Sequence, residues 1–385
     1  MSELGIRSYR FSISWPRVQP TGIGQPNAKG LDFYKRLVEA LREKDIKPMA
    51  TLFHWDLPEA LQSGPTGNAG WESRDTAYRF ADFATIVYEA LGDIVPTFCT
   101  INEPKTVVYV GYISGQHAPG VRSEARAWVA AHHLMLGHGL AVQALDASGK
   151  PAKIGPALGL GPTYPASDTE RAQAAARAND GREIRFWLDA VLRGEYPADT
   201  VAYIDRVSPM TSHIRGGDMK IISTPIDMVG VQYYGPAYVD DNGAAVVRRP
   251  TSEAGWQQIY PEGLYDVLTR IKKEYGDIPI VVTENGIPMP DVLRPDGHGG
   301  PDTVDDSQRI AFLRDHLAAA NRAIRADVRL IGYHVWSLLD NFEWAWGYEK
   351  RFGIVHVDYD TLVRTIKDSG HALARIAKES RPALS

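Results

Sequence analysis

Two glutamates of this 385-residue chain stand directly after short apolar runs. Glu103 follows Thr100-Ile101-Asn102, and Pro104 after it stops a strand, while Glu284 follows Val281-Val282-Thr283. Carboxylates at the same end of two strands can face each other across a sugar. Cleaving a glycosidic bond needs one carboxyl to protonate the leaving oxygen and one to attack or to activate water. Alternatively, both are unrelated glutamates that cap neighbouring helices, and position alone leaves both interpretations open.

The elements that would position these glutamates alternate along the chain. Near-continuous apolar runs predict seven strands covered on both faces. They are Ser8–Trp15, Pro48–Phe53, Val95–Asn102, Lys153–Leu160, Asp227–Tyr234, Pro279–Glu284 and Arg329–Trp336. Amphipathic stretches between them predict helices over Leu31–Lys44, Asp75–Leu91, Arg126–Leu145, Thr169–Leu192, Glu262–Tyr275 and Asp305–Arg325. This alternation predicts an α/β fold with a parallel sheet, either a closed barrel or a doubly wound sheet.

A closed (β/α)₈ barrel needs eight strands, one more than the sequence offers. Met1–Gly5 resembles the last turn of a helix, with Gly5 as its stop, and the first predicted strand follows at once. We therefore expect a strand and most of a helix to be missing from the front of such a barrel. The longest irregular stretches, which we expect to be loops over a site, are Pro58–Trp71, Asp240–Gly255 and Pro288–Thr303.

Composition excludes several classes of protein. A net charge of -5 without a basic run gives no electrostatic reason to expect nucleic acid. No apolar run reaches the roughly 18 residues of a membrane helix, and residues 1–7 contain no apolar core of a signal peptide. The lone Cys99 cannot form an intrachain disulfide, and we interpret it as a small buried hydrophobe. We expect a cytoplasmic protein.

Aromatic residues are abundant, with nine Trp, eighteen Tyr and ten Phe. Several stand beside carboxylates or histidines, as in His54-Trp55-Asp56 and Asn341-Phe342-Glu343-Trp344. Aromatic faces with polar edges suit sugars, but aromatics also fill large cores. Composition alone does not decide between these roles.

The chain resembles glycoside hydrolase family 1, the β-glucosidase family, over its whole length. The motifs that carry the resemblance occur in the family's order. They are Ser8-Tyr9-Arg10-Phe11-Ser12-Ile13-Ser14-Trp15-Pro16-Arg17, His54-Trp55-Asp56-Leu57-Pro58, Asn102-Glu103-Pro104, His117-Ala118-Pro119-Gly120, Thr283-Glu284-Asn285-Gly286, Trp336-Ser337-Leu338-Leu339-Asp340-Asn341-Phe342-Glu343-Trp344 and Phe352-Gly353-Ile354-Val355-His356-Val357-Asp358-Tyr359. The resemblance implies a (β/α)₈ TIM barrel, N-terminally truncated with seven of eight strands visible, as a single catalytic domain over residues 1–385.

The resemblance also implies roles for the polar residues. Glu103 matches the general acid/base and Glu284 the nucleophile of a double displacement that retains configuration, which needs carboxyls about 5–5.5 Å apart. Asn102 would hold the sugar 2-hydroxyl, while Arg10 and Tyr234 would keep the nucleophile ionised and oriented. We expect the pKa of Glu103 to be raised, because it must arrive protonated beside a charged Glu284.

Further matches predict the first sugar subsite, which comprises His54, Trp55, Asn102, Trp336, Glu343, Trp344 and Phe352. Enzymes of the family that take 6-phosphorylated sugars carry Ser and Lys near Glu343, so its carboxylate favours plain sugars. We expect no cofactor and no metal. His132, His133 and His138 lack the spacing of a zinc helix, and we interpret them as structural.

The sequence departs from the family at two places. Gln232 stands where the family usually has Asn, and its extra methylene would move the amide by about an ångström. The family's first strand, its helix and a sugar-binding Gln have no counterpart before Met1, either because the start was assigned late or because the barrel is truncated. For a truncated barrel we expect lower stability, weaker sugar binding and self-association through exposed strand edges.

The resulting prediction is a retaining β-glycosidase that acts on small-molecule β-glucosides or short β-linked oligosaccharides. Three rivals stay open. The first is a glycan-binding protein with impaired catalysis, the second a transglycosylating relative on the same scaffold, and the third a metal-dependent barrel hydrolase. The complete glutamate pair, with Arg10 and Tyr234, opposes the first. The lack of a credible ligand cluster in the sequence opposes the third.

Overall fold

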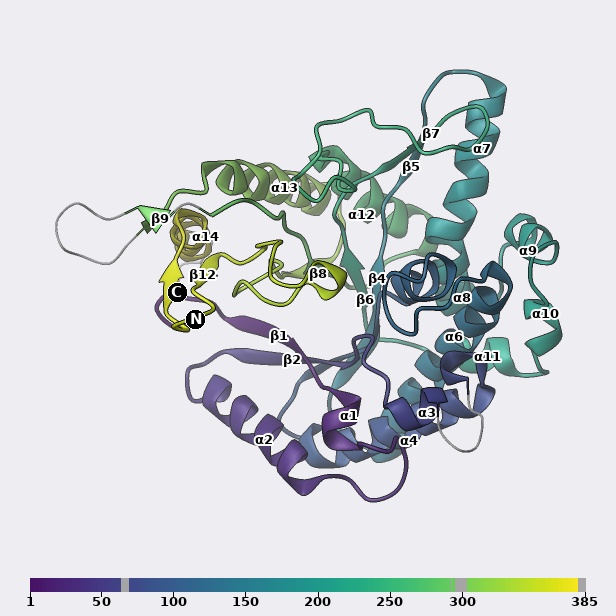
Figure 1. The fold of residues 1–385 in the computed structure, drawn as a ribbon, viewed down its shortest axis with the longest axis horizontal. Helices are drawn as coiled ribbons and strands as arrows, with labels where there is room; N and C mark the ends of the chain where they lie inside the picture. The colour runs from purple at the N-terminus through teal and green to yellow at the C-terminus, as the bar shows by residue number, and fades with distance from the viewer. Residues whose placement is uncertain (64–68, 292, 295–302, 380–385) are drawn as a thin grey trace. The chain divides into compact units, whose positions relative to one another are not determined.

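The computed structural model describes residues 1–63, 69–291, 293–294 and 303–379. By internal contacts the chain forms two compact units. The N-terminal unit comprises Ser8–Leu160 and Ala174–Gln232, and the C-terminal unit comprises Met1–Arg7, Gly161–Gln173 and Tyr233–Ser385. All seven predicted strands are present, and the ribbon in Figure 1 shows several of them.

Five parallel strands build the N-terminal unit, and they pair in the order β1, β2, β3, β4, β6. Their bounds are Ser8–Ser12, Lys47–Phe53, Thr97–Asn102, Lys153–Gly159 and Val229–Gln232. In β2, six consecutive residues after Lys47 are buried, which is the pattern of a strand covered on both faces. The apolar runs thus predicted these strands correctly.

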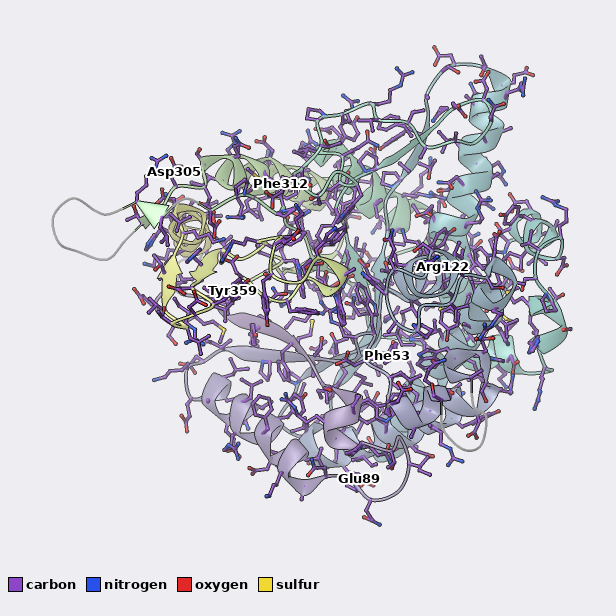
Figure 2. The ribbon with its side chains drawn as sticks, viewed as in Figure 1. Phe53, Glu89, Arg122, Asp305, Phe312 and Tyr359 are labelled. Carbon is purple, nitrogen blue, oxygen red and sulfur yellow. The ribbon has the colours of Figure 1, made fainter. Side chains whose placement is uncertain are left out.

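Helices connect the strands of the N-terminal unit. They are α1 (Trp15–Val18), α2 (Ala28–Arg42), α3 (Glu59–Ser63), α4 (Arg74–Leu91), α5 (Pro104–Thr106), α6 (Glu124–Ser148), α8 (Phe186–Arg193), α9 (Ala198–Ile204), α10 (Met210–His213) and α11 (Asp218–Ile222). Figure 1 shows α4 and α6 side by side, and Tyr88 of α4 donates to the Ala141 carbonyl of α6 at 3.1 Å. Phe53 lies in the interior, whereas Glu89 lies exposed on α4 (Figure 2).

Shorter turns complete these connections. A 3₁₀ turn spans Gly70–Glu72, and π-helical turns span Val107–Ile113 and Gly181–Arg185. The last of these divides the stretch predicted as one helix over Thr169–Leu192, so that α7 (Glu170–Asp180) ends before α8 begins. The expected loop Pro58–Trp71 contains α3 and the start of the 3₁₀ turn. Its residues 64–68 lie outside the described part of the chain.

In the C-terminal unit, β8 (Ile280–Glu284) runs parallel to β11 (Leu330–Tyr333). Its helices are α12 (Pro261–Tyr275), α13 (Ser307–Arg325) and α14 (Asp368–Glu379). Short strand pairs join β5 (Thr163–Pro165) to β7 (Ala237–Val239), β9 (Leu293–Arg294) to β10 (Thr303–Val304) and β12 (Val355–Val357) to β13 (Arg364–Ile366), and a 3₁₀ turn spans Trp344–Trp346. The expected loop Asp240–Gly255 lacks strands and helices, and residues 292 and 295–302 of Pro288–Thr303 lie outside the described residues.

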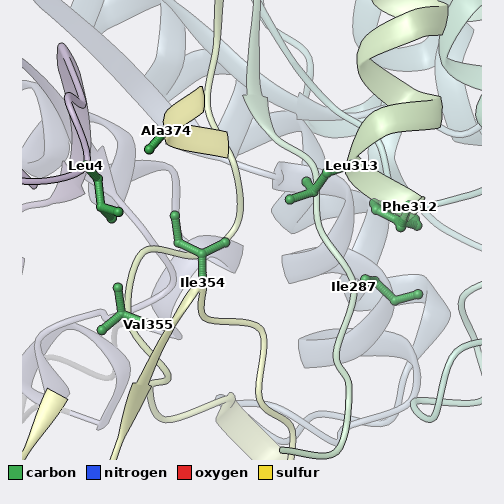
Figure 3. Close-up of a cluster of buried hydrophobic side chains, with 7 residues drawn as sticks. All are labelled: Leu4, Ile287, Phe312, Leu313, Ile354, Val355 and Ala374. Atoms are coloured by element: carbon green, nitrogen blue, oxygen red, sulfur yellow. The ribbon is translucent and has the colours of Figure 1, made fainter. Parts of the chain in front are cut away.

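An apolar core joins distant segments of the C-terminal unit (Figure 3). Its buried members are Leu4, Ile287, Phe312, Leu313, Ile354, Val355 and Ala374. Leu4 belongs to the turn predicted over Met1–Gly5, where the Gly5 amide donates to the Ser2 carbonyl at 2.9 Å and Gly5 has φ +67°. The core thus fixes the segment after β8, the start of α13 and the segment before β12 against one another.

We expect buried histidines to make the stability of the protein sensitive to acid. Burial lowers the pKa of His133, His138 and His316 to about 4. The unfolded chain takes up protons near pH 6.5, before the folded chain does, so stability is lost as the pH falls from 6.5 towards 4. At pH 5 each such histidine should cost on the order of 2 kcal/mol.

Thermal unfolding at pH 7.5 and pH 5.0 measures this loss. The melting temperature should fall on acidification, and His138→Gln should reduce the difference between the two pH values. His371→Asn, at an exposed position on α14, is the control and should leave the difference unchanged. An equal difference in wild type and His138→Gln would contradict the prediction.

Candidate active site

Glu103 follows the last residue of β3 in a left-handed backbone conformation, with φ +40°. Its amide donates to the Ala157 carbonyl of β4 at 2.8 Å, and its side chain lies over Gly159 at the end of β4. A methyl group on Gly159 would stand 2.8 Å from Glu103 Oε1, so this glycine makes room for the carboxyl. Thr106 Oγ1 donates to Glu103 Oε2 at 2.6 Å. A non-glycine residue in this conformation is uncommon and is often found at functional sites.

The helix-cap interpretation of the glutamates finds no support in the structure. Glu103 precedes α5, but its carboxylate makes no capping hydrogen bond to the helix backbone. Glu284 ends β8 and is followed by an irregular segment rather than a helix. The alternative left open by the sequence is therefore disfavoured.

Asn102, the last residue of β3, is held by two donors. Arg10 Nη2 donates to its Oδ1 at 2.5 Å and Gln232 Nε2 at 2.7 Å. Because an arginine can only donate, the side-chain oxygen of Asn102 is identified, and its amide nitrogen remains as the donor. Trp55 Nε1 donates to the Asn102 carbonyl at 2.9 Å. Arg10, Trp55 and Gln232, which were singled out from the sequence, thus all hydrogen-bond to Asn102.

Gln232 has a definite role in this arrangement. Its longer side chain reaches Asn102 from the end of β6, where both residues are buried. Gln232→Ala should lower kcat/KM for an aryl β-glucoside by about 10- to 100-fold, because a positioned amide displaced by 1 Å loses about that much. Gln143→Ala, an exposed amide on α6, is the control. Wild-type kinetics in Gln232→Ala would show that Asn102 does not need this donor.

His54 and Trp55 follow β2 on the same side of the N-terminal unit. Ser12 Oγ lies 2.6 Å from His54 Nδ1. Burial, reinforced by the charge of Arg10, lowers the pKa of His54 well below its usual value, so the imidazole is neutral at pH 7. Trp55 has φ +80°, and its ring centroid lies 5.3 Å from that of His117. A neutral imidazole can hydrogen-bond to a polyol, and the aromatic face beside it can stack on the polyol.

Glu284 is buried at the end of β8, with 4% of its surface exposed. Tyr234 donates its phenol to Glu284 Oε2 at 2.6 Å, and the Tyr233 amide donates to the Glu284 carbonyl at 3.1 Å. A hydrogen bond donated to a carboxylate favours its charged form. The contact supports the orienting role of Tyr234, which stays a prediction.

The residues directly after Glu284 pack against the backbone of Trp336. Asn285 Nδ2 donates to the Tyr233 carbonyl at 2.6 Å, and its Oδ1 accepts from Tyr333 at 2.5 Å. The Trp336 amide donates to the Asn285 carbonyl at 3.0 Å. A Cβ on Gly286 would lie 1.7 Å from the Trp336 carbonyl oxygen, so only glycine permits this close approach.

The remaining predicted residues lie in the same unit as Glu284. Phe352 is buried, and its ring meets that of Tyr234 edge-on at 6.1 Å. Glu343 and Trp344 are half-buried at a tight turn, where the Glu343 amide donates to the Gly347 carbonyl at 2.6 Å and Trp344 has φ +46°. Each unit therefore carries one candidate catalytic glutamate with its own supporting residues.

Sequence reasoning assigned no roles to Ser12, Thr106 and Asn285. Ser12 and Thr106 hydrogen-bond the predicted site residues His54 and Glu103, and Asn285 hydrogen-bonds the Tyr233 carbonyl. All three occur within the family-like motifs or three residues from Glu103, so their position was a usable signal.

One cluster in the described residues has the geometry of a metal site. Ligand atoms of Asp291, Asp340 and His356 lie within 4.8 Å of one another. Lys367 Nζ already lies 2.6 Å from Asp291 Oδ2 and 2.9 Å from Asp340 Oδ1. The ammonium group supplies the positive charge that a cation would bring, so these residues do not fit a metal ion. His132, His133 and His138 instead bond to Asp218, to the Trp71 carbonyl and to Thr100, respectively.

Known proteins are similar to the chain over nearly its whole length. The family model for glycosyl hydrolase family 1 matches residues 1–381. The chain is 42% identical to β-glucosidase A of Acetivibrio thermocellus, over 99% of this chain and 85% of the relative. It is 40% identical to a bifunctional β-D-glucosidase/β-D-fucosidase of Bifidobacterium breve, over 96% of this chain and 83% of the relative.

Solved structures give the same result. The β-glucosidase of Thermotoga maritima in complex with deoxynojirimycin superposes with a TM-score of 0.91 at 40% identity, over 99% of this chain and 85% of that one. A psychrophilic β-glucosidase from Micrococcus antarcticus superposes with a TM-score of 0.93 at 41% identity, with the same coverage of both chains.

The family match and the similar solved structures define the class first: the chain belongs to the glycoside hydrolases with a (β/α)₈-barrel fold, as predicted. More specifically, the chain belongs to glycosyl hydrolase family 1, whose members are retaining glycosidases.

Proposed function

We propose that the protein is a β-glucosidase that releases terminal non-reducing β-D-glucosyl residues, with Glu284 as nucleophile and Glu103 as general acid/base. The observation that carries the proposal is the buried Glu284 at the end of β8, held by the Tyr234 phenol. Relatives about 40% identical over nearly the whole chain are named β-glucosidases, which supports glucosides as substrates.

In the proposed mechanism the two glutamates flank one glycosidic bond. Glu103 protonates the leaving oxygen while Glu284 attacks the anomeric carbon and forms a glycosyl ester. Glu103 then removes a proton from water, which attacks the anomeric carbon and releases Glu284 as a carboxylate. Two inversions restore the original configuration.

The first sugar subsite in this proposal uses the residues described above. The Asn102 amide nitrogen donates to the 2-hydroxyl, a contact that strengthens in the transition state. His54 and Glu343 hydrogen-bond further hydroxyls, while Trp55, Trp336, Trp344 and Phe352 supply apolar faces. The Glu343 carboxylate disfavours 6-phosphorylated sugars by charge repulsion.

A stereochemical assay tests the proposal. 4-Nitrophenyl β-D-glucoside should be hydrolysed, and proton NMR at early times should show β-glucose before it mutarotates. Deoxynojirimycin should inhibit competitively, as expected if the glucose-shaped site resembles that of the Thermotoga maritima enzyme. Binding of deoxynojirimycin without turnover would instead support the impaired glycan-binding alternative, and dominant transfer to added methanol would support the transglycosylating one.

Three further parts of the proposal concern the protein as a whole. Residues 1–385 form one catalytic barrel domain, since the family match runs unbroken over residues 1–381. The protein works in the cytoplasm, which agrees with its single buried Cys99. It self-associates through strand edges, which size-exclusion chromatography with light scattering would test. No helix in the described ranges has the length and apolarity to cross a membrane.

A further inference from the structure

A buried charge cluster includes Asp340 and Arg351, which flank the turn that carries Glu343 and Trp344. Its charged members, all in the C-terminal unit, are Asp291, Asp306, Arg309, Asp340, Arg351 and Lys367. Lys367 and Asp340 have side chains that are 0% exposed. Fully buried charges are rare and costly unless they are paired, so this cluster requires an explanation.

Asp340 connects the two ends of the segment that carries Glu343 and Trp344. Its Oδ1 accepts from the Gly353 amide at 2.9 Å, and its Oδ2 accepts from Arg351 Nη1 at 2.8 Å. The backbone adds the bond from the Asp340 amide to the Val355 carbonyl, at 3.1 Å. We call residues 341–350 the Glu343 loop and these bonds its neck.

The atoms at the neck are tightly packed. A Cβ on Gly353 would lie 2.2 Å from the Asp340 amide nitrogen and 2.6 Å from Asp340 Oδ1. Ile354 and Val355, which follow Gly353, belong to the apolar core (Figure 3). On the outer side, Arg351 stacks over the ring of Tyr359, labelled in Figure 2, at 4.6 Å. Loop ends held this closely restrict where Glu343 can lie.

The charges around Asp340 keep it ionised. Burial acts to raise the pKa of its carboxyl, but Lys367 and Arg351 outweigh burial and hold the pKa below its usual range. Lys367 is shared with Asp291, which in turn accepts from His356 at 2.8 Å. Arg309 of α13 donates to the Arg351 carbonyl at 2.8 Å and thereby attaches the neck to a helix.

We propose that Asp340 is a positioning residue for sugar recognition, which closes the neck of the Glu343 loop and so fixes Glu343 and Trp344 for the sugar. Lys367 is its buried counter-ion. The inference rests on the proposed function, because it assigns Glu343 to the sugar subsite. It predicts that Asp340 acts on catalysis only through the loop.

A double-mutant cycle on the full chain tests this, with 4-nitrophenyl β-D-glucoside as substrate. Asp340→Asn should lower kcat/KM at least tenfold, because the amide cannot accept from both Arg351 and Lys367. In a Glu343→Ala background the same change should lower kcat/KM less than twofold, since the contact that it positions is already gone. Multiplying effects in the double mutant, or wild-type kinetics in Asp340→Asn, would overturn the proposal.

Asp291→Asn is the matched control from the same cluster. Asp291 shares Lys367 with Asp340, and its other partners are His356 at 2.8 Å and Arg309 at 4.0 Å rather than the Gly353 and Arg351 groups that close the neck. We expect this variant to lose a similar amount of thermal stability yet keep kcat/KM within twofold. A loss of kcat/KM equal to that of Asp340→Asn would assign the effect to general destabilisation and contradict positioning.

Two provisions keep the test decisive. If Asp340→Asn does not fold, Arg351→Lys weakens the same neck from its half-exposed side and should show the same lack of additivity with Glu343→Ala. If the wild-type chain does not hydrolyse glucosides, the proposed function fails, and the cycle is read on the Kd of deoxynojirimycin. Coupling of Asp340 to Glu343 in that Kd would support positioning independently of turnover, and its absence would contradict it.

Discussion

Glu284→Gly should lower kcat for 4-nitrophenyl β-D-glucoside by roughly 10⁴-fold or more, which is the scale of loss when a covalent catalyst loses its nucleophile. Glycine leaves space where the carboxylate stood, so azide or formate can take its place. Added azide should restore product formation and yield α-glucosyl azide, the product of a single inversion. Mass spectrometry and NMR of the product check this outcome.

Tyr234→Phe is the companion variant for Glu284. It removes only the phenol that donates to Glu284 Oε2 at 2.6 Å. We expect a smaller loss, about 10- to 1000-fold, without azide rescue, because the nucleophile is still present but less well oriented. Unchanged turnover in Glu284→Gly would contradict the assignment of the nucleophile.

Glu103→Ala should produce the second-largest loss, and its size should depend on the leaving group. General acid catalysis contributes roughly 10²- to 10⁴-fold, mostly when the departing oxygen needs a proton. The loss of kcat/KM should therefore be large for cellobiose and small for 2,4-dinitrophenyl β-D-glucoside. Azide should accelerate release of the glycosyl-enzyme and give β-glucosyl azide, the opposite anomer from the Glu284 variant.

The matched control for Glu103 is Glu89→Ala, an exposed glutamate on α4 (Figure 2). It should leave kcat/KM within twofold for both substrates. Equal losses on the two substrates in Glu103→Ala would show that this carboxyl does not protonate the leaving group.

The strands could be predicted because burial on both faces leaves a continuous apolar run. Their ends could not, because apolarity continues beyond the hydrogen-bonded ladder. The run Ser8–Trp15 contains β1, but its last residue, Trp15, belongs to α1. Trp15 is apolar because it packs against Phe83, with 5.2 Å between the ring centroids. Likewise α2 begins before its apolar spacing does, where Asn27 accepts from the Lys29 amide.

Placement of the candidate catalytic residues could also be predicted, since strand ends and motifs identified them. Their supporting contacts could not. Asn102 is held by residues 92 and 130 positions away, and no local pattern reports such pairs. The residues of the neck around Asp340 lie closer together in the sequence. Their charged side chains resemble those of an ordinary polar loop, and only the fold shows that they are buried.

One labelling experiment tests the central claim most directly. 2-Deoxy-2-fluoro-β-D-glucosyl fluoride forms the glycosyl-enzyme quickly and releases it slowly, so the intermediate accumulates. Intact mass and peptide mapping should show one fluoroglucosyl group per chain, attached to Glu284, with activity lost in proportion. A label on another residue, or full inactivity towards the reagent in a chain that hydrolyses glucosides, would contradict a double displacement through Glu284.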